Sequence, residues 1–130
     1  MNYIKDHHYV YKCNYHVIFC PKYRRKILEN GVDIRLKELF EEYAKNKNIE
    51  ILEMEIMPDH VHLLLSTHPK DNILDIIKSF KKQSASTLKK EFPYLKSKVP
   101  CIWTRSCFIL TVGSVSLDVV KQYIENQKRY

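Results

Sequence analysis

Two strand-like segments joined by a tight turn place the firmest constraint on how this chain can fold. Residues 49–56 alternate between apolar and polar side chains, and residues 60–67 are apolar at most positions. Met57-Pro58-Asp59 lies between them and has the composition of a turn. Because side chains alternate across a strand, the two segments predict a β-hairpin. In its first strand the predicted apolar face contains Leu52, Met54 and Ile56, and the opposite face contains Glu53 and Glu55.

The remaining segments extend this hairpin into a complete pattern of strands and helices. β-Branched and aromatic residues predict strands, and apolar residues at helical spacing predict helices. The predicted elements are a strand at 8–20, a helix at 31–46, a helix at 73–92 capped by Asp71 or Asn72, a strand at 102–112 and a short helix from Ser116. This order predicts an α+β fold, a ferredoxin-like or RRM-like βαββαβ antiparallel sheet with an additional C-terminal helix. The strands at 8–20 and 60–67 are expected to be adjacent at the centre of the sheet.

Length and composition limit the class of protein. A chain of 130 residues is expected to form a single domain spanning residues 1–130. The hydrophobic fraction of 45% and the nine tyrosines favour a folded globule over a disordered chain. No apolar run approaches a membrane span and no apolar leader opens the chain, so we expect a cytoplasmic protein without membrane contact. Four cysteines without Cys-x-x-Cys spacing fit free thiols in that compartment.

The charge of the chain points to a polyanionic partner. Lys and Arg number 22 against 15 Asp and Glu, which gives a net charge of +7. Basic residues gather in segments 22–26 and 78–90 with aromatic residues among them, which favours single-stranded nucleic acid over a membrane surface. The predicted nucleic-acid contacts are Lys22, Arg24, Arg25, Lys78, Lys81 and Lys82. The alternative is that these residues only form solvated helix faces.

His60 and His62 flank one apolar residue in the second strand of the predicted hairpin. The two imidazoles therefore point to the same face, about 6 to 7 Å apart along the backbone. Such a pair can bind one divalent cation, although a complete site needs further ligands. Asp59, which precedes the pair, could orient an imidazole or cap the turn. The alternative for the pair itself is an incidental or purely structural role.

Near the end of the chain, Tyr123 and Gln127 are four residues apart and share one face of the predicted last helix. On a basic domain with a metal-binding pair, a tyrosine suggests nucleophilic attack on a phosphodiester. The amide oxygen of Gln127 could complete the metal site, and an oxygen ligand suits Mg²⁺ or Mn²⁺. Tyr123 also fits the apolar stripe of a docking helix, together with Val119, Val120 and Ile124, so both roles are open at this point.

Taken together, these motifs resemble the single-tyrosine HUH transposases of the insertion-sequence 200/605 family. His60-Val61-His62 before Leu63-Leu64-Leu65 is similar to the His-hydrophobic-His core of HUH nucleases. Tyr123-Ile124-Glu125-Asn126-Gln127 is similar to the catalytic helix of the family. Pro21-Lys22-Tyr23-Arg24-Arg25 and Thr111-Val112-Gly113 also match, so the resemblance covers about residues 8–127. One departure is Cys107, where the resemblance leads us to expect an aromatic residue.

The resemblance implies a homodimeric enzyme that excises and inserts single-stranded DNA and recognises hairpins near the ends of the element. Tyr123 would be the catalytic nucleophile, leaving a 5′-phosphotyrosine and a free 3′-hydroxyl, while His60, His62 and Gln127 would bind Mg²⁺ or Mn²⁺. The active site would be composite, with the histidines from one subunit and the tyrosine helix able to come from the other. Two alternatives stay open: a domesticated relative that nicks hairpins without mobilising itself, and a module that binds single-stranded nucleic acid without cleaving it.

Overall fold

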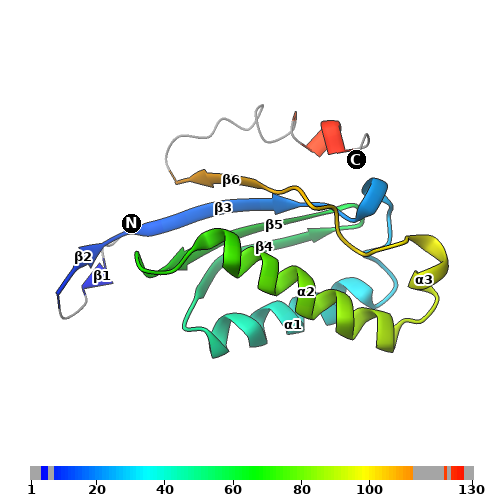
Figure 1. Ribbon diagram of the computed structural model, residues 1–130, viewed down its shortest axis with the longest axis horizontal. Coiled ribbons are helices and arrows are strands. Elements are labelled where there is room, and N and C mark those ends of the chain that lie inside the picture. The colour runs from blue at the N-terminus through cyan, green and yellow to red at the C-terminus, as the bar shows by residue number, and fades with distance from the viewer. Residues whose placement is uncertain (1–3, 6–7, 113–121, 123, 128–130) are drawn as a thin grey trace.

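A four-stranded antiparallel sheet forms the centre of the computed structural model, which describes residues 4–5, 8–112, 122 and 124–127 (Figure 1). The strands are β3 (Cys13–Phe19), β4 (Glu50–Met57), β5 (His60–Thr67) and β6 (Phe108–Thr111), in the order β4-β5-β3-β6 across the sheet. β3 and β5 are the adjacent central strands, as predicted, and Ile18 of β3 pairs with His62 of β5. The predicted α+β fold class is confirmed.

Two helices, α1 (Val32–Asn46) and α2 (Ile73–Glu91), cover the same face of the sheet (Figure 1). α1 begins after Gly31, whose φ of 96° lies in the left-handed region that glycine adopts without strain. α2 begins after Asn72, whose side-chain oxygen accepts hydrogen bonds from the backbone N–H groups of Leu74 and Asp75. Of the two caps considered from the sequence, the structure selects Asn72. In the part of the chain that the structure describes, no helix is long and apolar enough to cross a membrane.

The hydrophobic core lies between the two helices and the sheet face that they cover. Its centre is a set of aromatic contacts: the ring of Phe19 meets Phe40 and Trp103 edge to face, and Phe40 stacks on Phe80. Each buried phenylalanine contributes about 1.5–3 kcal/mol relative to an exposed one. Because Phe19 faces this core, the alternate positions of β3 and β5 face the other side of the sheet.

The first predicted strand is divided in the structure. β3 belongs to the four-stranded sheet, while β2 (Val10–Tyr11) pairs with β1 (Ile4–Lys5) in a separate two-stranded ribbon. Cys13 pairs with Thr67, the last residue of β5, so the described residues before Cys13 lie beyond the end of the neighbouring strand. The prediction of one continuous strand over 8–20 is therefore wrong.

The last predicted strand, at 102–112, is shorter than expected. A short helix, α3 (Leu95–Lys98), precedes this region, and β6 begins only at Phe108. Trp103 still forms an isolated bridge with Pro21. Between this bridge and β6, the ammonium of Lys81 in α2 donates hydrogen bonds to the carbonyls of Thr104 at 2.9 Å and Ser106 at 2.8 Å. These carbonyls are then engaged by a helix side chain instead of a neighbouring strand.

A bulge in β4 changes the predicted faces of the first hairpin strand. The pairing register shifts between Ile51 and Glu53, which leaves Leu52 as the extra residue. Ile51 packs against the core and Leu52 is 37% exposed. Met54 and Ile56 pack against the core as predicted. The prediction that Leu52 shares this apolar face is wrong, because the alternation restarts after the bulge.

Candidate active site

The two histidines of β5 lie on the sheet face away from α1 and α2. Val61 and Leu63 are 0% and 1% exposed and belong to the core between the sheet and the helices. His60 and His62 are half-buried and, by the alternation of the strand, face the opposite side. The two imidazoles therefore share one face, as the sequence predicted.

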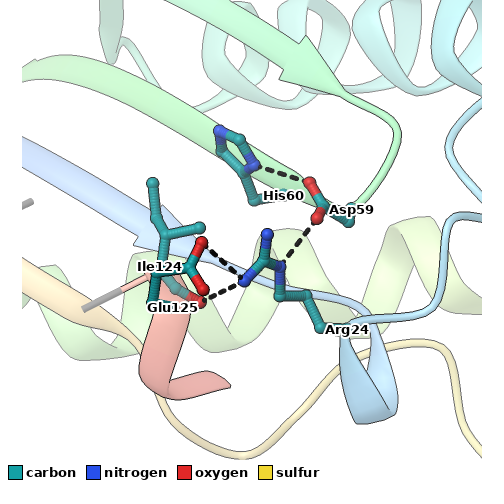
Figure 2. Close-up of polar contacts among 5 residues, drawn as sticks. All are labelled: Arg24, Asp59, His60, Ile124 and Glu125. Carbon is teal, nitrogen blue, oxygen red and sulfur yellow. Dashed lines mark hydrogen bonds and ion pairs between the residues drawn. The ribbon is translucent and has the colours of Figure 1, made fainter. Parts of the chain in front are cut away.

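Asp59, in the turn before β5, connects His60 to Arg24 (Figure 2). Nδ1 of His60 lies 2.9 Å from Oδ1 of Asp59, and Nε of Arg24 donates to Oδ2 at 2.7 Å. Burial alone would raise the pKa of Asp59, but the hydrogen bonds from His60 and Arg24 outweigh burial and lower the pKa. The ionised carboxylate holds the imidazole with Nδ1 protonated, which directs the Nε2 lone pair of His60 away from Asp59.

Arg24 also contacts the C-terminal segment of the chain (Figure 2). Its Nη1 donates to the backbone carbonyl of Ile124 at 3.2 Å and lies 3.5 Å from the carboxylate of Glu125. The Arg24 side chain is 13% exposed. Tyr23 and Arg24 have φ values of 58° and 51°, in the left-handed region that costs a non-glycine residue about 1–3 kcal/mol. A strained turn therefore directs this guanidinium into the site.

His62 has its own partner on β3. Its Nε2 lies 3.0 Å from Nδ1 of His16, and the two rings stack with their centroids 5.2 Å apart. Burial lowers the pKa of His62 and the nearby His16 lowers it further, against the opposing effect of Glu55, which pairs with His62 across the sheet. The net effect favours the neutral imidazole that binds metals.

Gln127 is 3% exposed and lies beside the loop before β6. Its Oε1 accepts a hydrogen bond from the hydroxyl of Ser106 at 2.9 Å, and the Ser106 carbonyl is one of the two that Lys81 binds. The predicted nucleophile, Tyr123, lies outside the described residues, as does the predicted start of the last helix at Ser116.

The three side chains considered as metal ligands offer two kinds of donor atom, imidazole nitrogen and amide oxygen. His60 directs Nε2 away from its carboxylate partner, and Gln127 offers an amide oxygen with a second lone pair beyond the one that Ser106 uses. His62 contacts His16 through Nε2, so binding a cation through this atom requires that contact to break. Among the described residues, no three His, Cys, Asp or Glu side chains lie close enough to form a metal site. A cation held by His60 and His62 would therefore take further ligands such as an amide oxygen or water.

The six predicted nucleic-acid contacts fall into two groups. Arg24 and Lys81 bind partners inside the protein, and burial lowers the pKa of Lys81. The other four are half-buried or exposed; they are Lys22, Arg25, Lys78 and Lys82. Lys22 and Arg25 flank the turn that carries Arg24, whereas Lys78 and Lys82 belong to α2.

The sequence did not predict the roles of three side chains in the site. The contact of Arg24 with Asp59 has no local signal, since Arg25 is the same residue type one position later. Ser106, which binds Gln127, has no signal either. His16 lies two residues before Ile18, the partner of His62 in the sheet, so it could have been found once the strand register was known.

The chain is similar to known transposases over most of its length. Residues 9–127 match the family model described as "Transposase IS200 like". The chain is 40% identical over 125 residues to the ISDra2 transposase TnpA of Deinococcus radiodurans, covering 95% of this chain and 89% of that protein. It is 31% identical over 126 residues to the transposase for insertion sequence element IS200 of Salmonella typhimurium, covering 93% and 83%.

Solved structures are also similar to this one, and two of them are informative. A Deinococcus radiodurans R1 protein described as a transposase matches with a TM-score of 0.88 at 38% identity, covering 95% of this chain and 97% of that chain. The REP-associated tyrosine transposase bound to a REP hairpin matches with a TM-score of 0.58 at 14% identity, covering 94% and 68%. The second match is a likeness of fold alone.

Proposed function

Because this chain belongs to the IS200-like transposase family, we propose that it cleaves and rejoins single-stranded DNA at the ends of an insertion sequence. Tyr123 is the proposed nucleophile. His60, His62 and Gln127 are the proposed ligands of one Mg²⁺ or Mn²⁺ ion, and the amide oxygen of Gln127 is a donor of the kind that these metals prefer.

The proposed reaction is a phosphoryl transfer in two steps, cleavage and rejoining. The phenolate oxygen of Tyr123 attacks phosphorus, the bond from phosphorus to the 3′ oxygen breaks, and that oxygen takes a proton to become a 3′-hydroxyl. The 5′-phosphate stays on the protein as a phosphotyrosine. In the second step a 3′-hydroxyl attacks this phosphorus, which forms a new phosphodiester and releases the tyrosine. A bound divalent cation would polarise the scissile phosphate and stabilise the developing charge.

The double contact of Arg24 is the observation that carries this proposal. Its guanidinium binds Asp59, which holds His60, and it also binds the carbonyl of Ile124, the residue after Tyr123 (Figure 2). Two segments that are 100 residues apart in the sequence therefore meet at one side chain. This supports a site formed jointly by the histidine strand and the C-terminal segment.

The proposed substrate carries hairpins near the ends of the element, and the proposed assembly is a homodimer with composite active sites. The structurally similar REP-associated tyrosine transposase was solved with a REP hairpin. The exposed Arg25, Lys78 and Lys82 supply positive charge for DNA. In the structure Arg24 holds Ile124 of its own chain. If the tyrosine helix is exchanged between subunits, this contact must break and form again across the dimer.

A denaturing gel tests the proposal. Purified protein is mixed with end-labelled single-stranded DNA from the flanks of its gene, with Mg²⁺, with Mn²⁺ or with a chelator. We expect a covalent protein–DNA adduct that needs the cation and is absent with Tyr123→Phe. Tyr94→Phe is a matched control, because Tyr94 is 46% exposed and lies in the segment before α3.

Two outcomes would overturn it. An adduct formed equally well by Tyr123→Phe would show that another residue is the nucleophile. DNA that is bound but never cleaved, under any of the metal conditions, would favour the non-catalytic binding module.

A further inference from the structure

A hollow of about 450 Å³ lies between α2 and the loop before β6. This α2 hollow is defined by its floor, Ile77, Ala85, Ile102 and Trp103, and by its rim, Lys78, Lys82, Lys89 and Arg105. Its volume falls within the range of about 300–1,000 Å³ that small-ligand pockets occupy. His60, His62 and Gln127 are not among the described residues that line it, so it is separate from the candidate active site.

The α2 hollow combines an apolar floor with a cationic rim. Ile77, Ile102 and Trp103 are at most 7% exposed, so their positions are fixed by packing in the core. Among its described lining residues there is no acidic side chain. The hollow between α1 and β4 is a useful contrast, because Glu41 and Glu53 line it together with Lys37 and Lys45. Of these two hollows, only the α2 hollow has the charge that favours an anionic partner.

The wall of the α2 hollow is held in place by internal hydrogen bonds. Lys81 fixes the carbonyls of Thr104 and Ser106 to α2, and the indole N–H of Trp103 donates to Ser84 at 3.0 Å. Lys81 therefore shapes the wall. The same loop reaches the candidate active site, since Ser106 donates to Gln127. A ligand in the hollow would contact a wall that continues to the proposed metal ligand.

Cys107 also lines the α2 hollow. It stands where the family resemblance led us to expect an aromatic residue, and it is half-buried against the core. A thiol occupies less space than an aromatic ring, so the departure at this position leaves room in the hollow.

We propose that the α2 hollow binds one unpaired nucleotide of the DNA substrate, with the base on the apolar floor and the neighbouring phosphates on the cationic rim. The proposal rests on the proposed function, because it takes single-stranded DNA as the ligand. Apolar contact for a base combined with Lys and Arg for the backbone is the usual chemistry of single-strand binding. A base that is paired in a duplex stays stacked on its neighbours and would not reach the floor of the α2 hollow.

Trp103 provides a direct readout, because it is the single tryptophan of the chain. Its emission is followed while a short oligothymidylate is added to the full-length protein, and a fluorescein-labelled copy gives the affinity by anisotropy. We expect a saturable change in emission. An oligomer of abasic sites with the same number of phosphates should bind about tenfold more weakly and leave the emission unchanged.

Substitutions distinguish the contribution of the rim to binding from that of the floor. Lys82→Ala and Arg105→Ala should each weaken binding of the oligothymidylate and reduce its log–log salt slope by about 0.7. Lys45→Ala, which removes a charge that is also exposed but lies on α1, is the matched control and should bind as the wild type does. Cys107→Phe should weaken binding of the oligothymidylate about tenfold and leave the abasic oligomer unaffected, because it fills the floor and removes no charge.

Three results would overturn the proposal: unchanged Trp103 emission at saturating oligothymidylate, rim variants that bind like Lys45→Ala, or an equal emission response to duplex DNA. Failure of the proposed function is a different result, namely no Tyr123-dependent adduct in the wild type. If the protein forms the adduct but its Trp103 emission stays constant on binding, the proposed role of the α2 hollow is wrong and the proposed function still holds.

Discussion

Arg24 and Asp59 form an ion pair at 2.7 Å in which each side chain is 13% exposed. Both oxygens of the carboxylate are used, one by Arg24 and the other by His60. The guanidinium has a further contact, with the carbonyl of Ile124. The pair is therefore the junction through which the position of the C-terminal segment and the orientation of the His60 imidazole depend on each other.

Arg24→Lys should separate DNA cleavage from DNA binding. Lysine keeps the charge but lacks the planar fork that serves Asp59 and Ile124 together. We expect the single-turnover rate of adduct formation to fall about a hundredfold, the order of loss that follows a small misplacement of reacting groups. DNA affinity should stay close to wild type. Arg25→Lys, at the exposed neighbouring position, should change neither quantity. Equal rates of adduct formation for the two variants would show that Arg24 has no role in the site.

Asp59→Asn should weaken metal binding in the absence of DNA. The amide cannot hold His60 with the same strength as an ionised carboxylate, and loss of such a partner typically lowers metal affinity about 10–100-fold. Titration of free protein with Mn²⁺, followed by electron paramagnetic resonance, measures this affinity. Asp75→Asn in the first turn of α2 is the control. An unchanged Mn²⁺ affinity for Asp59→Asn would contradict the role of Asp59.

The lowered pKa of Asp59 also predicts how stability changes with acid. The folded protein binds this proton at lower pH than the unfolded chain does, so the unfolded state binds more protons as the pH falls. The stabilisation is complete above about pH 5, begins to fall near the ordinary Asp pKa of about 4, and is lost as the pH falls through the lowered pKa. Urea unfolding at pH 5 and pH 3 should show a smaller loss of stability for Asp59→Asn than for wild type. The same loss in both proteins would refute the coupling.

Lys81→Ala should destabilise the fold, although Lys82→Ala should not. Removal of the Lys81 ammonium takes a donor from the carbonyl of Thr104, which is a buried residue, whereas the exposed Ser106 keeps a hydrogen bond from the Thr104 hydroxyl to its carbonyl. An unsatisfied buried polar group costs about 1–3 kcal/mol. The exposed Lys82 should change the free energy of unfolding by less than about 0.5 kcal/mol. Urea unfolding of both variants measures the difference, and similar values would show that the loop does not depend on Lys81.

Cys20 and Cys101 should differ sharply in reactivity. Burial raises the pKa of the Cys20 thiol to about 12, and the charge of Asp59 adds to the effect. At pH 8 about one Cys20 in ten thousand is then a thiolate, the form that reacts. Cys101 is exposed. Brief treatment with iodoacetamide followed by peptide mass spectrometry should find label on Cys101 and not on Cys20. Comparable labelling would show that the end of β3 opens readily.

The sequence was most informative where a structural feature depends on neighbouring residues. The hairpin of β4 and β5 and the shared face of His60 and His62 follow from alternation along a strand, which needs no tertiary information. The α2 cap is local in the same way, and the sequence limited it to Asp71 or Asn72. These features could therefore be predicted from the residue pattern.

Features that depend on distant partners were not predictable in this way. The bulge at Leu52 comes from the pairing of β4 with β5, and the segment before the shortened β6 is bound by Lys81, more than twenty residues before it. The Arg24–Asp59 pair joins residues that are 35 positions apart. Each case needs the register of the finished sheet, and alternation along a single strand cannot supply it.

The bulge in β4 has a consequence for how this protein behaves when crowded. β4 is an edge of the sheet, and an edge strand exposes backbone groups that can recruit strands from other molecules. The extra residue at Leu52 interrupts the regular spacing of those groups, and the exposed carboxylates of Glu50, Glu53 and Glu55 would repel an identical edge. At high concentration, copies of this protein should therefore resist polymerising through β4.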